Sequence, residues 1–283
     1  MALKPLADAV SLLKNPILWL PGVYAGVIIA SSLWLVFSGG EFIAGKLLFL
    51  GAVLFPFFIA GAIGCISTRD YGYETFSRYA VKYYFPVLLP VIVIIAIIIL
   101  LLILFSIPFA IAGLGNDPAL IGGLFIGIMV PVIIFSFYAD NVAVSEGLKV
   151  FASLKRSMII ASRSFMTIIS CIVISGVGAA ALGMITAMVW GMILADRFTQ
   201  YLDMGMAEQQ KIFSTFGLSD WQRILGPHGI AITAILIGLY VMLLISVFIT
   251  YKQKCFESAH TEEPEIPAQS TGEYDEKGRW YKY

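Results

Sequence analysis

The chain contains a run of fifteen residues, from Val91 to Phe105, without one polar side chain. Many of these residues are β-branched, and in water such a run would favour a strand. In lipid an unpaired strand cannot satisfy its backbone hydrogen bonds, whereas a helix satisfies them within itself. The run therefore predicts part of a helix that crosses a membrane.

Six stretches are apolar enough, and at about 20 residues long enough, to cross a bilayer as helices. The composition agrees, because 59% of the residues are hydrophobic and 13% are charged, against about a quarter charged in soluble domains. We expect an all-α, polytopic membrane protein with about six transmembrane helices, interfacial amphipathic helices and a disordered C-terminal tail. The predicted spans are residues 17–37, 47–67, 84–111, 119–138, 165–193 and 230–250.

Residues 1–16 precede the first span and resemble a short interfacial helix, because Leu6, Val10 and Leu13 share one helical face. A break is expected at Asn15-Pro16, since a residue before proline disfavours the helical conformation. The six spans then form one transmembrane domain, residues 17–255.

Residues 256–283 are acidic and contain proline, serine and glycine, so they have too little apolar surface to fold and should be a disordered tail. The tail ends in KGRWYKY. This ending has three readings: a peptide motif for a protein partner, aromatic side chains that return to the membrane surface, or a frayed end without a role.

Basic residues are distributed unevenly between the two sides of the predicted spans. Eleven Lys and Arg residues fall in the N-terminal segment, the second and fourth loops and the start of the tail, against four in the first, third and fifth loops. Because cytoplasmic loops carry the excess of Lys and Arg, we expect a multi-pass protein of the cell membrane with both termini in the cytoplasm.

Small residues recur every four positions along the fifth span, where they form one shallow groove on a helix. The spacing predicts a buried central helix over residues 165–193. The fourth span carries a GxxxG pair. Packing within one bundle is the favoured reading, with homodimerisation as the alternative. The predicted helix-packing residues, in addition to Cys171, are Ser175, Ala179, Gly183, Ala187, Gly191, Gly123 and Gly127.

Two basic amphipathic segments precede the third and fifth spans. In the second of them Leu148, Phe151, Leu154 and Met158 form an apolar face, and the first uses Phe76, Tyr79 and Tyr83. Such helices lie among lipid headgroups, where basic residues gain energy near an anionic leaflet. The shared order of helix, basic interfacial helix and helix also suggests an internal repeat. The expected headgroup-binding residues are Lys149, Lys155, Arg156, Arg78 and Lys82.

The stretches KNPILWLP, residues 14–21, and VSEGLKVFASLKRS, residues 144–157, together with six spans, resemble an uncharacterised group of bacterial and archaeal six-helix membrane proteins. That group is similar to the membrane module that precedes some glycerophosphodiester phosphodiesterase domains. The resemblance covers about residues 1–255 and implies a six-helix fold and membrane residence. It implies no catalytic residues, and the tail is too short to contain a phosphodiesterase domain.

Chemistry-bearing residues are sparse. None of the six span interiors contains Asp, Glu, Lys, Arg or His, and such residues commonly mark coupled transport. The two histidines, His228 and His260, lack the spacing of a metal motif. The three cysteines are read as free thiols. We therefore expect no catalytic, metal or cofactor site, membrane lipids as partners together with a candidate protein partner for the tail, and no nucleic acid.

The leading hypothesis is a non-enzymatic integral membrane protein of structural, accessory or envelope-maintenance type, acting through helix and lipid contacts. The alternative is a transporter or lipid-handling protein with a cavity among proline-kinked helices, lined by Ser175, Thr186 or the region of Asn141. A third class, a membrane-embedded enzyme, would need polar groups to converge near His228.

Overall fold

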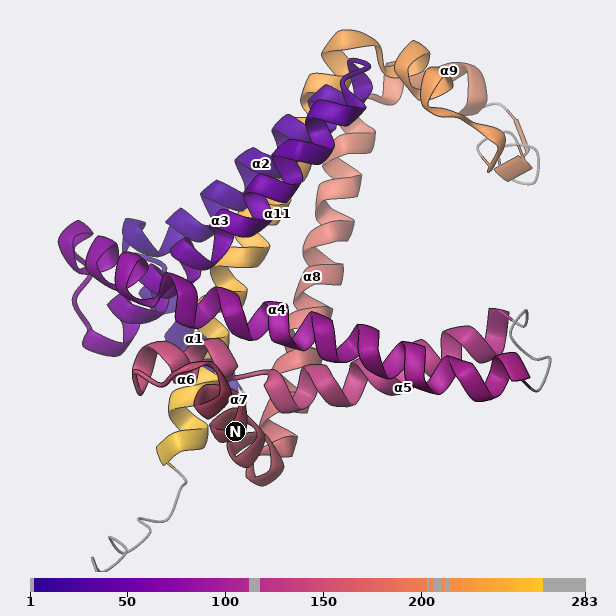
Figure 1. The fold of residues 1–283 in the computed structure, drawn as a ribbon. Helices are drawn as coiled ribbons and strands as arrows, with labels where there is room; N and C mark the ends of the chain where they lie inside the picture. Colours follow the sequence, from indigo (N-terminus) through magenta and orange to yellow (C-terminus); the bar gives the residue numbers. More distant parts are fainter. Residues whose placement is uncertain (1–2, 112–117, 203, 206–209, 212–213, 262–283) are drawn as a thin grey trace, which may run out of the picture.

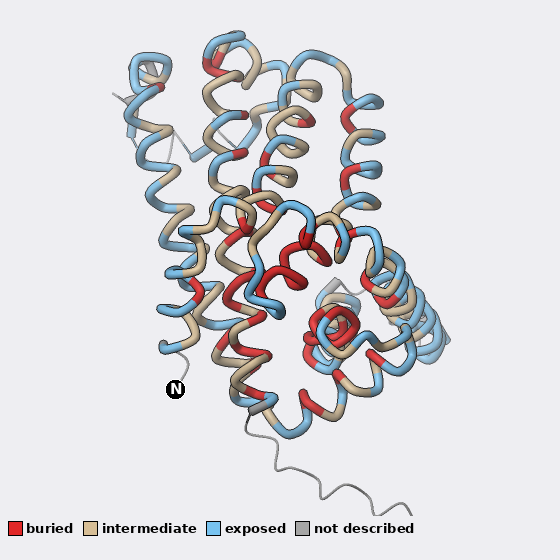
Figure 2. The backbone as a smooth tube through the Cα atoms, turned by 90° about the vertical axis from the view of Figure 1, so that its left-hand side faces the viewer, coloured by how far each residue is buried: buried red, intermediate tan, exposed pale blue. Residues whose placement is uncertain are grey.

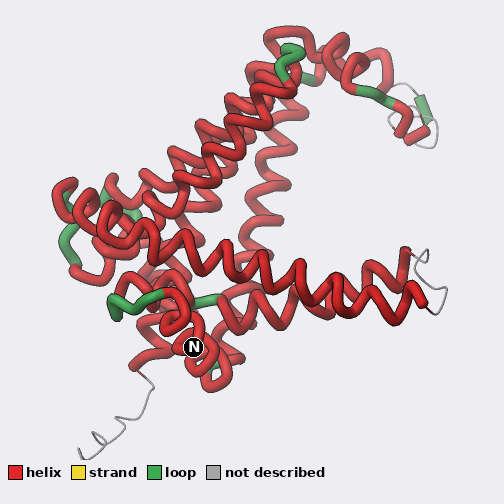
Figure 3. Tube along the Cα trace, in the orientation of Figure 1, coloured by secondary structure: helices red, strands yellow, loops and turns green. Residues whose placement is uncertain are grey.

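The structure, a computed structural model, describes residues 3–111, 118–202, 204–205, 210–211 and 214–261 (Figure 1). Within these ranges every regular element is helical (Figure 3). Six helical segments are long and apolar enough to cross a membrane, so the predicted all-α fold with six spans is confirmed. The elements are α1 (Leu3–Leu12), η1 (Pro16–Trp19), α2 (Leu20–Phe37), α3 (Glu41–Thr68), α4 (Tyr73–Ile111), α5 (Pro118–Ser136), α6 (Ala139–Ser145), α7 (Val150–Arg163), α8 (Phe165–Ile193), α9 (Ala195–Leu202) and α11 (Leu218–Thr261).

Several helices extend beyond the predicted spans, because a helix continues past the hydrocarbon core wherever its polar residues permit it. The fifth span agrees with α8 at both ends. By contrast, α4 already begins at Tyr73, so the first basic segment forms its opening turns instead of a separate interfacial helix. The shared order behind the proposed repeat is therefore not reproduced there.

The last helix, α11, begins earlier and ends later than the predicted sixth span. Its backbone is broken at Gly226, where φ is 62° and ψ is 177°, just before Pro227. Nearby, the side chain of Gln222 donates to the carbonyl oxygen of Phe37 at 2.8 Å and so ties the start of α11 to the end of α2. At its far end α11 includes residues 256–261, which belong to the tail predicted to be disordered, and buries Phe256 and Ala259.

The centre of the bundle is α11, which packs along α2 and also contacts α1, α3 and α8. Its backbone approaches α2 closely at Gly22 and Gly26. A Cβ atom on Gly26 would overlap the carbonyl oxygen of Gly238, and one on Gly22 would overlap that of Met242. Glycine at these positions therefore permits the backbones of α2 and α11 to approach each other closely.

The prediction that residues 165–193 form the buried central helix is wrong. Along α8 only Ile168 and Cys171 are buried, and Figure 2 shows exposed residues along most membrane-spanning helices outside the core. A Cβ placed on Gly176 or Gly191 would have no described atom within 4 Å. The small residues of α8 leave a groove along the helix, but no described helix packs into it at Gly176 or Gly191.

The helices diverge from one end of the molecule. We call this end the base; it is where α1, α6, α7 and the last turns of α11 meet (Figure 1). From the base, the α4–α5 hairpin runs in a different direction from α8 and α11. Its apolar side chains are exposed, as Ile103 is by 57% and Ile126 by 62%. The bundle is therefore tight around α2, α3 and α11 and splayed at α4–α5 and α8.

Candidate functional site at the base of the bundle

An ion pair joins α11 to α6 at the base. The ammonium group of Lys252 donates to both carboxylate oxygens of Asp140, at 2.6 and 2.7 Å. The two side chains are only 13% and 20% exposed. The same ammonium nitrogen lies 5.1 Å from the centre of the Phe137 ring, a distance at which a cation is attracted to the ring face. Low exposure and two short contacts make this pair a firm link.

A hydrogen-bonded amide pair lies beside the ion pair. Asn141 Nδ2 donates to Gln253 Oε1 at 2.6 Å, and both residues are almost fully buried. Gln253 Nε2 in turn donates to Ser67 Oγ at 3.2 Å and to Ser145 Oγ at 3.4 Å. One side chain of α11, Gln253, thus connects the end of α3 with both ends of α6.

Further charged groups surround this centre. Arg156 Nε of α7 lies 3.3 Å from the carboxylate of Glu146, and His260 Nδ1 lies 3.9 Å from the same carboxylate. Lys254 and Glu257 form a pair at 2.6 Å. The Arg156–Glu146 pair thus links α7 to the end of α6, whereas Lys254 and Glu257 pair within α11.

The cluster is built from ion pairs and hydrogen bonds between helices. Its charged side chains bind one another, and in the described residues no group of three or more His, Cys, Asp or Glu side chains could hold a metal ion. His228, considered above for a membrane-embedded enzyme, lies at the other end of α11, just after the break at Gly226. What the base cluster does is fix the short helices α6 and α7 against the end of α11.

A turn outside the spans has its own polar arrangement. Asp70, between α3 and α4, accepts hydrogen bonds from the Thr75 hydroxyl and from the Gly72 N–H, the latter at 3.1 Å. These hydrogen bonds, the Thr75 hydroxyl first, lower the pKa of the Asp70 carboxyl below its ordinary value. Beside it, burial raises the pKa of the Tyr71 hydroxyl. The ionised Asp70 side chain thus fixes the start of α4.

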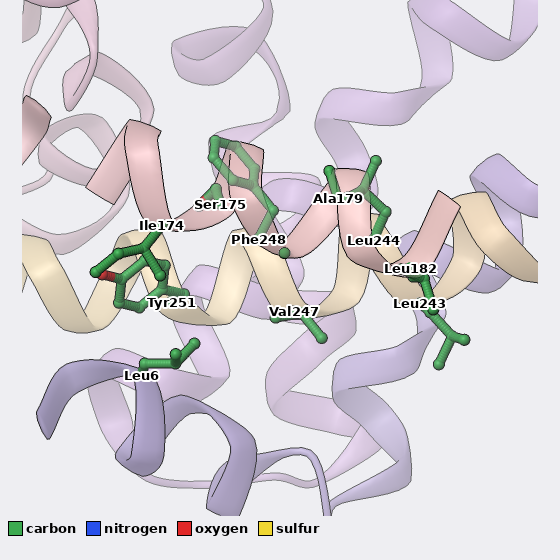
Figure 4. Close-up of a pocket in the computed structure, with 11 residues that line it drawn as sticks. Leu6, Ile174, Ser175, Ala179, Leu182, Leu243, Leu244, Val247, Phe248 and Tyr251 are labelled. Carbon is green, nitrogen blue, oxygen red and sulfur yellow. The ribbon is translucent and has the colours of Figure 1, made fainter. Parts of the chain in front are cut away.

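An apolar pocket of ≈ 170 Å³ opens between α8 and α11 (Figure 4). It is bounded toward the base by Leu6 of α1 and Tyr251 of α11. Its wall is almost entirely hydrocarbon, and Gly178 exposes the backbone of α8 to it. The remaining lining residues are Ile174, Ser175, Ala179, Leu182, Leu243, Leu244, Val247 and Phe248.

The predicted helix-packing residues fall into two groups. Ser175 and Ala179 line the pocket, and a Cβ on Gly183 would lie 3.8 Å from the Tyr240 ring, whose hydroxyl donates to the Ala179 carbonyl oxygen at 3.3 Å. Ala187 is exposed. No described atom comes within 4 Å of a Cβ placed on Gly191, Gly123 or Gly127. The first group faces α11, and the second faces away from the other described helices.

The residues predicted to bind lipid headgroups differ in their exposure and in their contacts. Lys149 and Lys155 are exposed. Arg78 is exposed and pairs with Glu74 at 2.7 Å, and the Lys82 ammonium lies 4.9 Å from the Tyr83 ring centre. Arg156, by contrast, is turned toward Glu146 in the base cluster.

The inward face of α7 carries serines. Ser157 accepts a hydrogen bond from the Tyr138 N–H at 3.1 Å and donates to the Phe135 carbonyl oxygen at 2.9 Å. It therefore satisfies backbone groups freed at the end of α5. Of the predicted apolar face, Phe151 is 76% exposed and Met158 52%, whereas Leu148 packs against the buried cluster at the base.

The base cluster is the part of the site that sequence reasoning missed. From the sequence, Lys252 contributes only to the count of basic residues after the last span, and nothing predicts a contact for Gln253. A combined signal existed, because the polar pair Asp140-Asn141 follows one apolar run and the polar pair Lys252-Gln253 follows another. Nothing in the sequence shows that the two pairs meet across more than a hundred residues.

Fold and site together define a multi-pass helical membrane protein with a network of ion pairs at its base. Searches of protein-family models, of curated proteins and of solved structures found no match to the chain.

Proposed function

We propose that this is a non-enzymatic integral membrane protein of structural, accessory or envelope-maintenance type, which acts through contacts with lipids and with other helices. The observation that carries the proposal is the splayed pair of arms, α4–α5 and α8. Their apolar side chains are exposed along helices long enough to span a membrane, Met188 of α8 by 69%. At that depth an exposed apolar face contacts lipid or another transmembrane helix.

The orientation belongs to the same proposal. The base contains the exposed Lys149 and Lys155 next to the outward-facing Phe151 of α7. An apolar side chain between lysines suits a helix at headgroup level, with about 1 kcal/mol gained for each basic residue near an anionic leaflet. We therefore place the base and both termini on the cytoplasmic side of the cell membrane, in line with the positive-inside rule.

One observation favours the lipid-handling form of the alternative hypothesis. The pocket between α8 and α11 is lined by apolar side chains, which suits a hydrocarbon and not a polar solute. The resemblance to the membrane modules of some glycerophosphodiester phosphodiesterases also belongs to this alternative, because those enzymes act on compounds derived from phospholipids.

The proposal is tested by extracting the full chain from its native membrane into polymer discs and measuring their lipids and proteins. We expect enrichment of anionic lipid over the bulk membrane, reduced in the variant Lys149→Gln/Lys155→Gln. Lys46→Gln, a lysine near the opposite end of the spans, is the matched control and should leave the enrichment unchanged. Discs with the composition of the bulk membrane and no specific protein would overturn the proposal.

Two further measurements address the remaining parts of the proposal. Incubation of the protein with labelled phospholipid should give no hydrolysis products. Steady hydrolysis of the phospholipid would contradict the hypothesis that the protein is not an enzyme. The predicted partner motif lies in residues 262–283, outside the described residues. Deleting this segment leaves α11 complete, and identical co-purifying proteins with and without it would remove the partner hypothesis.

A further inference from the structure

The pocket lies between α8 and α11, two helices that are long and apolar enough to span a membrane. Its lining on α8 runs from Ile174 to Leu182 and on α11 from Leu243 to Tyr251, a stretch of about 12 Å along each helix. Both stretches belong to the candidate spans. Figure 4 shows Leu6 and Tyr251 at one end of the pocket and Leu182 and Leu243 at the other. The pocket is thus elongated along the two helices, and its base end is covered by α1.

Physical chemistry limits what can occupy such a space. An apolar cavity of about 150 Å³ stays dry and accepts an apolar guest, and this pocket, of ≈ 170 Å³, is of that size. An empty pocket would leave its lining without dispersion partners on one side. Since the surrounding solvent at this depth is hydrocarbon, the occupant has the chemistry of a hydrocarbon chain.

We propose that the pocket holds a segment of one acyl chain of a membrane phospholipid from the leaflet on the side of the base. This inference rests on the proposed function, since it names the lipid contact of the α8 arm. Gly178 contributes by lacking a side chain, because no described atom lies within 4 Å of a Cβ placed there and the chain can approach the helix backbone. The gain over bulk lipid comes from packing against a concave wall, not from the hydrophobic effect.

The experiment compares a substitution that fills the pocket with the same substitution at a position outside it. Gly178→Phe places a ring into the pocket, whereas Gly176→Phe adds the same ring on the same helix at a position that does not line it; a Cβ at either position has no described neighbour within 4 Å. The full chain is reconstituted in phosphatidylglycerol vesicles containing phosphatidylglycerol with a diazirine in one acyl chain. After irradiation, labelled residues are mapped by mass spectrometry.

We expect labelling of Leu243 and Val247 to exceed that of Ile235 and Leu239, which lie exposed on the same helix. Gly178→Phe should reduce pocket labelling several-fold, and Gly176→Phe should leave it unchanged. Equal labelling of pocket and exposed positions, or equal labelling in both variants, would overturn the inference. Size-exclusion profiles check folding, and Val247→Trp narrows the pocket from α11 if Gly178→Phe does not fold.

The failure of this inference differs from the failure of the proposed function. Without pocket labelling, but with lipid enrichment in native discs, only the acyl-chain site is removed. If native discs show neither lipid enrichment nor a specific protein, the proposed function falls, whatever the vesicle experiment shows.

Discussion

The chain carries the GxxxG pattern on two helices, and the two copies are packed in opposite ways. Gly22 and Gly26 of α2 lie against the backbone of α11, so that no side chain fits between the helices. Gly123 and Gly127 of α5 have no described atom within 4 Å of a Cβ position. The same spacing of glycines thus occurs at a close backbone contact between two helices and on an open face.

The difference shows that a small-residue groove permits close packing but does not create it. On α11 the partner surface is complementary, because Gly238 offers its own backbone to Gly26 and a Cβ there would lie 2.9 Å from the Ala30 side chain. On α5 and the outer part of α8 no described helix supplies such a surface. Those faces are left to lipid or to another protein.

The largest effect is expected from a methyl group in the tight seam between α2 and α11. Gly26→Ala places a Cβ against the carbonyl oxygen of Gly238, which cannot move without shifting α11. We expect a loss of about 3 kcal/mol in the free energy of unfolding, the upper range for overpacking. The measurement is an unfolding titration in detergent micelles.

Gly123→Ala is the matched control for that substitution, since it adds the same methyl group to the same motif on the open face. It should leave stability unchanged or raise it by up to about 1 kcal/mol, because alanine favours a helix. Similar losses in both variants would show that the two copies of the motif are packed alike, against the structure.

The comparison also shows what could be predicted from the sequence. The six spans followed from length and hydropathy, because apolar runs in lipid have one stable backbone solution. The choice of central helix was wrong, because periodicity identifies a groove on one helix and not the helix that fills it. The glycine of α11 at the seam, Gly238, is the only glycine in the predicted span 230–250 and forms no GxxxG pair there.

The base cluster could not be predicted for a related reason. The polar residues that follow each apolar run were visible, but Asn141 and Gln253 lie 112 positions apart in the chain. Their contact depends on how the short helix α6 packs beside the end of α11. At α7 the exposure of Lys149 and Lys155 follows from the pattern, whereas the hydrogen bonds of Ser157 at the end of α5 do not.

A smaller loss than at the seam is expected when the base ion pair is broken. Lys252→Met removes the charge that faces Asp140 and leaves that carboxylate in a site with 20% exposure. Fully buried pairs cost about 3–5 kcal/mol when one partner is removed, so we expect about 2 kcal/mol here. Unfolding titrations under the same conditions as for Gly26→Ala give the comparison.

Arg78→Met is the control, because the Arg78–Glu74 pair has similar length but is 65% and 86% exposed. Surface pairs contribute about 0–1 kcal/mol, and the variant should be close to the original protein. The double variant Asp140→Asn/Lys252→Met should recover part of the loss, since it leaves no unpaired charge. If Lys252→Met were as mild as Arg78→Met, the base cluster would not hold the helices together.

The smallest effect is expected at the turn between α3 and α4, where Asp70 lies. Hydrogen bonds from Thr75 and Gly72 lower the pKa of Asp70, so their stabilising contribution is present above the unfolded pKa of about 3.9 and is lost as the pH falls through the folded pKa. Thr75→Val removes the hydroxyl donor and should raise the Asp70 pKa toward its ordinary value, whereas Thr75→Ser should keep it low. Carboxyl ¹³C shifts of labelled Asp70, followed through acidic pH, measure this. An unchanged pKa in Thr75→Val would leave the Gly72 N–H as the donor that holds the turn, and the start of α4 would then depend on backbone contacts alone.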